Sequence, residues 1–266
     1  MLAIPDLKKA KIEKRKLTMV TCYDYAFAKI IEGTEIDLVL VGDSVAMVMH
    51  GHPSTVHADV PMMELHTKAV ARGTKNQLII GDMPFLSLSL GTGSALQAAG
   101  TLIRAGAHAV KIENVRGFEE AIELMVKSGI PVMGHLGLTP QSVNVFGGMK
   151  LQAKTDETQK QLLADALLFQ KLGACALVLE CVPVSVANEV SEALEIPTIG
   201  IGAGSGTDGQ VLVLQDLLGF QKDFKPKFLK SYLDGGAVIS NALNEYVREV
   251  KTGAFPSLAE SYGVKT

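Results

Sequence analysis

Eight short apolar runs, separated by longer amphipathic stretches, constrain the fold of this chain more than any other feature. Each run is nearly uninterrupted and rich in Val, Ile or Leu, which is typical of parallel strands covered on their outer face. The runs are 17–22, 37–42, 77–82, 109–113, 131–135, 176–180, 197–202 and 211–216. The helical segments between most of them are 25–32, 59–72, 94–105, 118–127, 157–172 and 185–193.

This alternation predicts an α/β fold, a (β/α)8 TIM barrel, with an open doubly wound sheet as the alternative. Two similar segments of the sequence support a repeated unit. RAGAHAVKIE (104–113) and KLGACALVLE (171–180) both combine a helix end, a Gly-Ala turn and a strand ending in Glu. No linker interrupts the chain, so we predict a single barrel domain over 1–266, in which 221–266 is a helical C-terminal extension.

Composition excludes several classes of function. Twenty-five basic against 28 acidic side chains give a net charge of −3, so no nucleic-acid partner is expected. Three cysteines without a CxxC pair make neither a disulfide framework nor a thiolate zinc site. The N-terminal segment is charged and no long uncharged apolar window occurs, so we expect no signal peptide, no membrane span and a cytoplasmic location.

Ionisable side chains end five consecutive runs, from the second to the sixth. In a (β/α)8 barrel these strand ends lie on one rim, where active sites are built. A single acid at such a place is most often a helix cap or a solvated loop residue, but five on one rim indicate a site. In chain order the rim residues are Asp43 with Ser44, Asp82, Lys111 with Glu113, His135 and Glu180.

The carboxylates of this rim require a positive partner. Adjacent strands lie about 4.8 Å apart, so Asp43, Asp82 and Glu113 would bring three negative charges together. Lys111 lies on the same strand face as Glu113 and offsets part of that charge. A divalent cation would offset more, and carboxylate oxygens without thiolates favour Mg²⁺ over Zn²⁺.

Two further motifs allow more than one interpretation. His50, His52 and His57 form either a polar flap over the barrel mouth or part of an H-x-H zinc site. The glycine-rich segment 200–210 follows the seventh run, where barrels often bind phosphate, but a tight turn explains it equally well.

Eight motifs follow one another along the chain in a fixed order. They are TCYDY (21–25), VGDSVAM (41–47), GDMPF (81–85), VKIE (110–113), GHLGLTPQSVNVFGG (134–148), LVLECVP (177–183), IPTIGIGAG (196–204) and DGQVLVLQDLLG (208–219). This ordered set resembles the ketopantoate hydroxymethyltransferase family, which belongs to the phosphoenolpyruvate mutase and isocitrate lyase superfamily of Mg²⁺ barrels. The resemblance covers roughly residues 15–256.

The resemblance implies hydroxymethyl transfer from 5,10-methylenetetrahydrofolate to 3-methyl-2-oxobutanoate, giving 2-dehydropantoate in pantothenate synthesis. It also implies a large homo-oligomer, commonly a decamer. In that chemistry the oxo acid chelates Mg²⁺, a carboxylate removes the proton on C3, and the metal-stabilised enolate attacks the methylene carbon.

Site roles follow by the same resemblance. Asp43 and Asp82 match metal-site aspartates that also contact substrate, and Glu113 matches the third acid of that site. Ser44, Lys111 and His135 match substrate-contacting positions, and Glu180 matches the proton acceptor. Superfamily members that cleave C–C bonds or move P–C bonds typically carry a cysteine after the fourth or fifth strand, and residues 113–150 contain none. A non-enzymatic binding protein is the other alternative.

Overall fold

The computed structural model describes residues 2–221 and 226–263, which fall into two compact units, Met1–Val213 and Leu214–Thr266. In the first unit eight parallel strands close into a barrel, each hydrogen-bonded to its neighbours in chain order and β8 to β1. The strands are β1 (Leu17–Thr21), β2 (Leu38–Val41), β3 (Leu78–Asp82), β4 (Ala109–Glu113), β5 (Val132–Gly137), β6 (Ala176–Glu180), β7 (Thr198–Ile201) and β8 (Gly209–Leu212). The predicted (β/α)8 barrel is confirmed.

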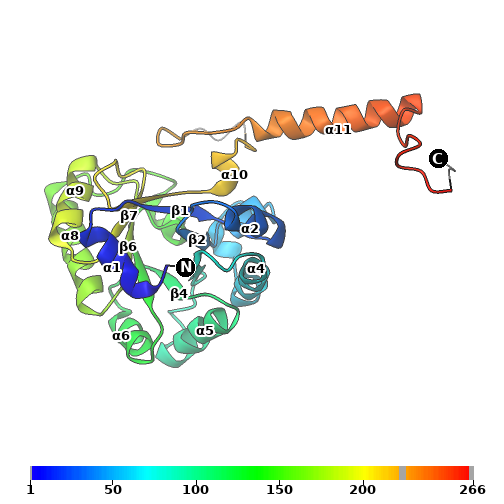
Figure 1. Ribbon diagram of the computed structural model, residues 1–266. Coiled ribbons are helices and arrows are strands. Elements are labelled where there is room, and N and C mark those ends of the chain that lie inside the picture. The colour runs from blue at the N-terminus through cyan, green and yellow to red at the C-terminus, as the bar shows by residue number, and fades with distance from the viewer. Residues whose placement is uncertain (1, 222–225, 264–266) are drawn as a thin grey trace. The chain divides into compact units, whose positions relative to one another are not determined.

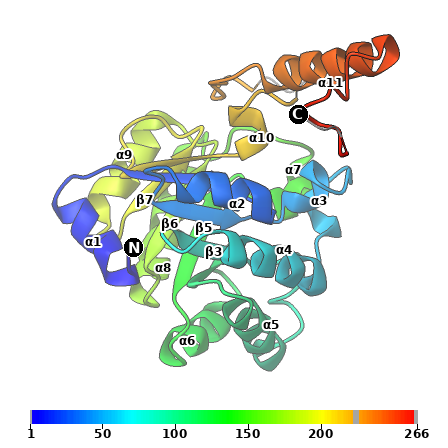
Figure 2. The same ribbon diagram turned by 45° about the vertical axis from the view of Figure 1, so that its right-hand side comes forward.

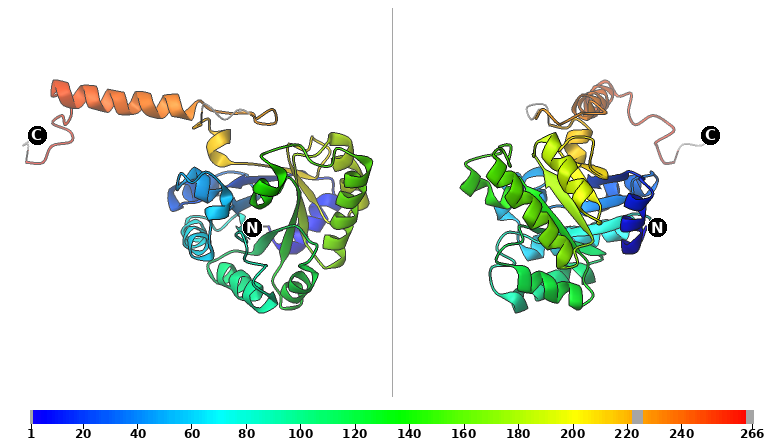
Figure 3. Two further views of the ribbon diagram at one scale, coloured as in Figure 1. Left: turned by 180° about the vertical axis from the view of Figure 1, so that it is seen from behind. Right: turned by 90° about the vertical axis from the view of Figure 1, so that its left-hand side faces the viewer.

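Helices surround the strands (Figures 1 and 3). The long ones on the outside are α2 (Tyr25–Glu32), α4 (Val60–Gly73), α5 (Thr92–Arg104), α6 (Glu119–Lys127), α8 (Asp156–Lys171) and α9 (Val184–Ala193). Neighbouring helices such as α4, α5 and α6 pack side by side around the barrel (Figure 2). Short helical turns lie in the loops: α3 (Val45–Val48), η1 (Thr55–His57), η2 (Pro140–Ser142) and α7 (Val143–Phe146).

The last part of the barrel departs from the predicted alternation. The chain passes from β7 to β8 through the loop 202–208 without a helix. The predicted strand 211–216 was wrong in its bounds, because β8 begins at Gly209 and the apolar residues beyond it form α10 (Leu214–Leu217) of the second unit. Leu214 is buried like the side chains of the core, although it belongs to a helix and not to a strand.

The second unit also contains α11 (Gly235–Thr252), an 18-residue helix whose first turn is capped by Asp234. The predicted extension 221–266 falls within this unit, and its residues 222–225 and 264–266 lie outside the described part of the chain. None of the helices in the described part combines the length and apolar composition that crossing a membrane requires.

A helix that the sequence did not predict, α1 (Ile4–Ile12), covers the N-terminal end of the barrel. Its Leu7 and Ala10 are buried in the same cluster as the strand side chains. Its Lys8 and Lys11 form ion pairs with Glu195 and Asp208, which precede β7 and β8. With this end closed, the opposite end of the barrel is available for a site.

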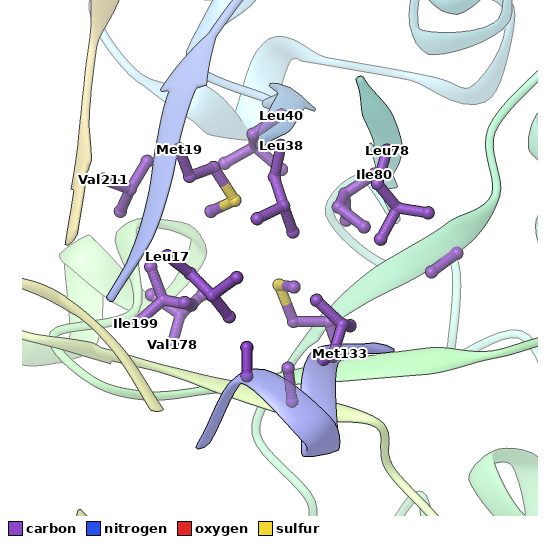
Figure 4. Packing of buried hydrophobic residues seen from close by; sticks show 14 residues of the cluster. Leu17, Met19, Leu38, Leu40, Leu78, Ile80, Met133, Val178, Ile199 and Val211 are labelled. Carbon is purple, nitrogen blue, oxygen red and sulfur yellow. The ribbon is translucent and has the colours of Figure 1, made fainter. Parts of the chain in front are cut away.

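Apolar side chains from all eight strands pack together in the barrel interior (Figure 4). Leu17 and Met19 of β1 point inward, as do Leu38 and Leu40 of β2, because residues two apart on a strand share a face. The outward residues of several strands, such as Val39 of β2 and Ile79 of β3, are buried as well, which explains the uninterrupted apolar runs in the sequence.

Candidate functional site

The inward-facing side chains change from apolar to ionisable toward the C-terminal ends of the strands. On β3, Leu78 and Ile80 are followed at the same spacing of two by Asp82, and on β4 Ala109 is followed by Lys111 and Glu113. On β5 and β6 the corresponding inward series are Met133 with His135, and Ala176 and Val178 with Glu180. One strand periodicity thus builds the hydrophobic core and places a charged layer above it.

Lys111 lies at the centre of this layer. Its Nζ is 2.9 Å from Asp82 Oδ1, 3.7 Å from Glu113 Oε1 and 3.2 Å from His135 Nδ1. Strand register accounts for these contacts, since Asp82 pairs with Lys111 and Glu113 pairs with His135 on neighbouring strands. All four side chains are buried.

Asp43 and Ser44 reach the same site from the loop after β2. The Asp43 backbone N–H donates to Asp82 Oδ2 at 3.0 Å, which joins the ends of two neighbouring strands. Ser44 Oγ lies 2.8 Å from the hydroxyl of Tyr23, a buried residue that follows β1. Asp43 is 4% exposed, so its carboxylate belongs to the buried group rather than to solvent.

Burial makes the negative charge of the site costly. It raises the pKa of Asp43 to about 6 and the pKa values of Asp82 and Glu113 to about 7. Repulsion from Glu113 adds to the shift of Asp43, whereas the Lys111 ammonium opposes all three shifts. The site therefore has too little positive charge for three ionised carboxylates.

The protonation states of Lys111 and His135 follow from their neighbours. Burial alone would lower the pKa of Lys111, but Asp82, Glu113 and Asp43 outweigh it and hold that pKa well above its usual range. Burial, aided by the Lys111 charge, lowers the pKa of His135, which favours the neutral ring. An ammonium only donates, so His135 Nδ1 accepts and Nε2 carries the proton.

Glu180 lies beside the Lys111 cluster and contacts its His135. Its Oε2 lies 3.2 Å from His135 Nε2, and its side chain is 16% exposed, against 1% for Asp82. Gly137, at the end of β5, has φ of +94° and lies against this residue, where an added Cβ would be 2.2 Å from the Glu180 carbonyl oxygen. The backbone of two strands thus fixes the place of Glu180.

Sequence reasoning missed Gln141, which lies in η2 after β5. Its Nε2 donates to Asp43 Oδ2 and to the Met83 carbonyl, each at 2.9 Å, and its backbone N–H donates to Glu113 Oε2 at 3.0 Å. Gln141 lies within the motif GHLGLTPQSVNVFGG, but a glutamine in a loop carries no signal that would connect it to acids so far away in the chain.

The three carboxylates fit a hard cation such as Mg²⁺. In the described residues, no group of three or more His, Cys, Asp or Glu side chains forms a complete metal-binding site by itself. Mg²⁺ does not require one, because it is usually held by one or two carboxylates together with water and substrate oxygens. Glu113 Oε1 is buried without a hydrogen-bond partner among the described residues, and Asp82 Oδ1 faces only the Lys111 ammonium in an ion pair. Asp43 and Asp82, with Glu113 beside them, are therefore suitable ligands.

The histidines after β2 form a cluster of their own. His50 Nε2 lies 2.9 Å from Nε2 of His66, a residue of α4, and the rings of His52 and His57 stack at 4.6 Å. The first contact joins the segment after β2 to α4, and the second lies within that segment.

Comparison with known proteins decides the family. The family model for ketopantoate hydroxymethyltransferase matches residues 1–258. A 3-methyl-2-oxobutanoate hydroxymethyltransferase of Bdellovibrio bacteriovorus is 52% identical over 262 residues, which covers 98% of this chain and 100% of that protein. The chain belongs to the ketopantoate hydroxymethyltransferase family. The family resemblance predicted from the motifs is confirmed, as is the assignment of the chain as a hydroxymethyltransferase. A relative from Caldicellulosiruptor saccharolyticus with the same name is also 52% identical, over 96% of both chains.

Solved structures with the same fold belong to more distant enzymes. Phosphonopyruvate hydrolase, in complex with oxalate and Mg²⁺, superposes with a TM-score of 0.63 at 13% identity and covers 98% of this chain and 93% of its own. For 2,3-dimethylmalate lyase, a member of the phosphoenolpyruvate mutase and isocitrate lyase superfamily, the TM-score is 0.60 at 15% identity, over 100% of this chain and 92% of the lyase. This chain therefore shares the fold of these enzymes.

Proposed function

We propose that this chain transfers a hydroxymethyl group from 5,10-methylenetetrahydrofolate to 3-methyl-2-oxobutanoate and forms 2-dehydropantoate. The observation that carries the proposal is the division of the rim carboxylates into three buried around Lys111 and a fourth, Glu180, placed apart from them. A cation-binding group and a separate base are what proton removal next to a carbonyl requires. The names of full-length relatives at 52% identity support the choice of substrate.

The buried carboxylates would hold Mg²⁺, with Asp43 and Asp82 as ligands and Glu113 beside them. When bound, the cation would draw electron density from the ketone of the oxo acid and make the C3 proton more acidic. The oxalate and Mg²⁺ in phosphonopyruvate hydrolase support Mg²⁺ as the partner of an oxo acid in this fold, because oxalate, like a 2-oxo acid, presents oxygens on two adjacent carbons.

Glu180 is the residue we assign to proton removal. It ends β6 on the inward face, it is more exposed than the acids around Lys111, and it is not needed to hold the cation. In the proposed reaction, its carboxylate takes the C3 proton, and the resulting enolate carbon forms a bond with the methylene carbon. Both C–N bonds that join this carbon to the folate break, and water supplies the oxygen of the new hydroxymethyl group. Tetrahydrofolate leaves, its two nitrogens having taken up the C3 proton and one proton of the water. His135, whose Nε2 lies 3.2 Å from Glu180 Oε2, orients that carboxylate, while Lys111 and Ser44 supply donors for the oxygens of the oxo acid.

Proton exchange separates the first step from group transfer. The wild-type protein, incubated with 3-methyl-2-oxobutanoate and Mg²⁺ in D₂O without folate, should replace the C3 proton by deuterium, followed by NMR. A positioned base contributes about 10²–10⁴-fold, so Glu180→Gln should exchange at least about a hundredfold more slowly while binding the oxo acid with similar affinity. Glu195→Gln, at the opposite end of the barrel, is the matched control and should exchange like the wild type.

Two results would contradict the proposal in different ways. Undiminished exchange in Glu180→Gln would assign the proton to another group, with His135 the next candidate. If the wild-type protein formed no 2-dehydropantoate from the two substrates in the presence of Mg²⁺, the proposed activity itself would be wrong.

We further propose that the chain acts as a homo-oligomer, with a decamer as the expected size, in the cytoplasm. On α11 the side chains of Ile239, Leu243, Tyr246 and Val250 recur at helical spacing and are 47–61% exposed, and such an apolar stripe is typical of a helix that packs against a partner. The three cysteines are free, in accord with a reducing compartment. Light scattering after size-exclusion chromatography tests the oligomer, and a monomeric mass would contradict it.

A further inference from the structure

The three buried carboxylates of the site share a pattern of hydrogen bonds that the proposed function does not by itself require. Each of the three buried carboxylates has one oxygen that accepts from an N–H group: Asp43 Oδ2 from Gln141 Nε2, Asp82 Oδ2 from the Asp43 backbone, and Glu113 Oε2 from the Gln141 backbone. Of the second oxygens, Glu113 Oε1 accepts no hydrogen bond among the described residues, and Asp82 Oδ1 faces the Lys111 ammonium at 2.9 Å.

Two of these three donors belong to Gln141. Its side-chain nitrogen contacts two acceptors, the Asp43 carboxylate and the Met83 carbonyl, so the amide is fixed with its nitrogen rather than its oxygen toward the site. Met83 directly follows Asp82. One loop residue after β5 therefore holds the ends of β2, β3 and β4 together.

We propose that Gln141 is a positioning residue for the cation site. By holding Asp43 Oδ2 and Glu113 Oε2, it sets the orientation of both carboxylates and reserves their other oxygens for a divalent cation. The inference rests on the proposed function, because it assigns Gln141 to the cation site that this function uses. Hydrogen-bond partners of metal-binding carboxylates commonly act in this way, and their loss typically lowers metal affinity about 10–100-fold.

Manganese binding tests this role without catalysis. Mn²⁺ substitutes for Mg²⁺ at oxygen sites, and the electron paramagnetic resonance signal of the free ion falls as it binds. Gln141→Leu keeps the size of the side chain and the backbone N–H but removes the amide donor, and its Kd for Mn²⁺ should be about 10–100-fold higher than that of the wild type. Gln141→Met, which keeps the unbranched length, is the second variant and should give the same shift if Gln141→Leu does not fold.

The control removes the same kind of contact elsewhere. Gln161 Nε2 donates to Asp165 Oδ1 at 2.7 Å on the surface of α8, so Gln161→Leu also deletes an amide-carboxylate bond and should leave the Kd for Mn²⁺ unchanged. A second readout separates positioning from loop damage. In Gln141→Leu the Mg²⁺ concentration for half-maximal activity should rise by the same factor, whereas turnover at saturating Mg²⁺ should stay within about threefold of the wild type.

A double variant tests whether Gln141 affects Mn²⁺ binding through Asp43. If Gln141 acts through Asp43, then adding Gln141→Leu to Asp43→Asn should weaken Mn²⁺ binding much less than it weakens binding to the wild type. Equal Mn²⁺ affinity in wild type and Gln141→Leu would overturn the role of Gln141, and so would a loss of turnover that saturating Mg²⁺ does not restore. A wild-type protein that binds no Mn²⁺ would instead overturn the cation site of the proposed function.

Discussion

Replacement of Lys111 by Met tests how much the buried charges of the site contribute to the stability of the protein. The Lys111 side chain is 4% exposed, with carboxylate oxygens at 2.9 and 3.7 Å, so its removal leaves buried acids without a counter-charge. Breaking one side of a buried ion pair costs about 3–5 kcal/mol. Total stabilities of single domains are about 5–15 kcal/mol, so the loss should be large and still measurable by urea unfolding at fixed protein concentration.

The loss of stability in Lys111→Met should depend on pH, and the pKa values of the acids determine in which direction. An acid whose pKa is higher in the folded than in the unfolded state costs no stability while it is protonated in both states, and it costs stability as pH rises from the unfolded toward the folded pKa. In the wild type the folded values are about 6 for Asp43 and about 7 for Asp82 and Glu113, and loss of Lys111 moves all three upward. Lys111→Met should therefore lose much more stability at pH 8 than at pH 5.5, where the acids can take up protons.

A surface lysine provides the control. Lys127 pairs with Glu123 at 2.9 Å on the exposed face of α6, and such a pair contributes about 0.3–0.5 kcal/mol. Lys127→Met should thus change the free energy of unfolding little at either pH. An equal loss at pH 5.5 and pH 8 in Lys111→Met would refute the electrostatic reasoning, because packing alone does not depend on the protonation of carboxylates.

Two further predictions concern the cysteines and Gly137. Burial raises the pKa of Cys22 and Cys181 to about 11 and that of Cys175 to about 12, so all three should react slowly with a thiol reagent at pH 8, and the denatured, unreduced protein should titrate as three free thiols. Titration of a single thiol would reveal a disulfide. Gly137→Ala should lower the free energy of unfolding by about 1–3 kcal/mol and slow C3 exchange, because the new Cβ collides with the Glu180 carbonyl. Gly129→Ala, also at positive φ but with open space around its Cβ, separates backbone strain from this collision when both variants are unfolded in urea.

The barrel and the rim could be predicted because the same apolar runs mark the strands and the places where they end. Buried parallel strands are apolar on both faces, so their runs are visible in the sequence, and a polar residue that ends such a run must lie at the C-terminal edge. Asp82, Glu113 and Glu180 are cases of this kind, and the structure places all three on the inward face. Their roles in binding and catalysis stay predictions.

The remaining features depend on contacts that no local pattern encodes. Gln141 is 98 residues from Asp43 in the chain, and only the path of the loop after β5 brings them together. Helix α1 buries only Leu7 and Ala10 among mostly charged neighbours, so its apolar face is too narrow to give a clear period. β8 was misplaced because the apolar run in the sequence continues into α10, where Leu214 is buried. An apolar run of this length does not distinguish a strand from a buried helix.

Charge balance makes a last prediction about cation binding. Three ionised carboxylates around one ammonium and a neutral His135 would leave two negative charges in a buried site, which either two protons or one divalent cation can neutralise. Folded pKa values of about 6 to 7 mean that protons already supply part of this neutralisation near neutral pH. In the proposed site Mg²⁺ must therefore displace protons as it binds, and the number released should fall as pH rises from 6 to 8.5 because fewer remain bound. Titration calorimetry in buffers with different ionisation enthalpies measures that number directly. A release that stays at zero across this range would mean that the cation does not bind among these carboxylates, since any ligand set drawn from Asp43, Asp82 and Glu113 competes with protons.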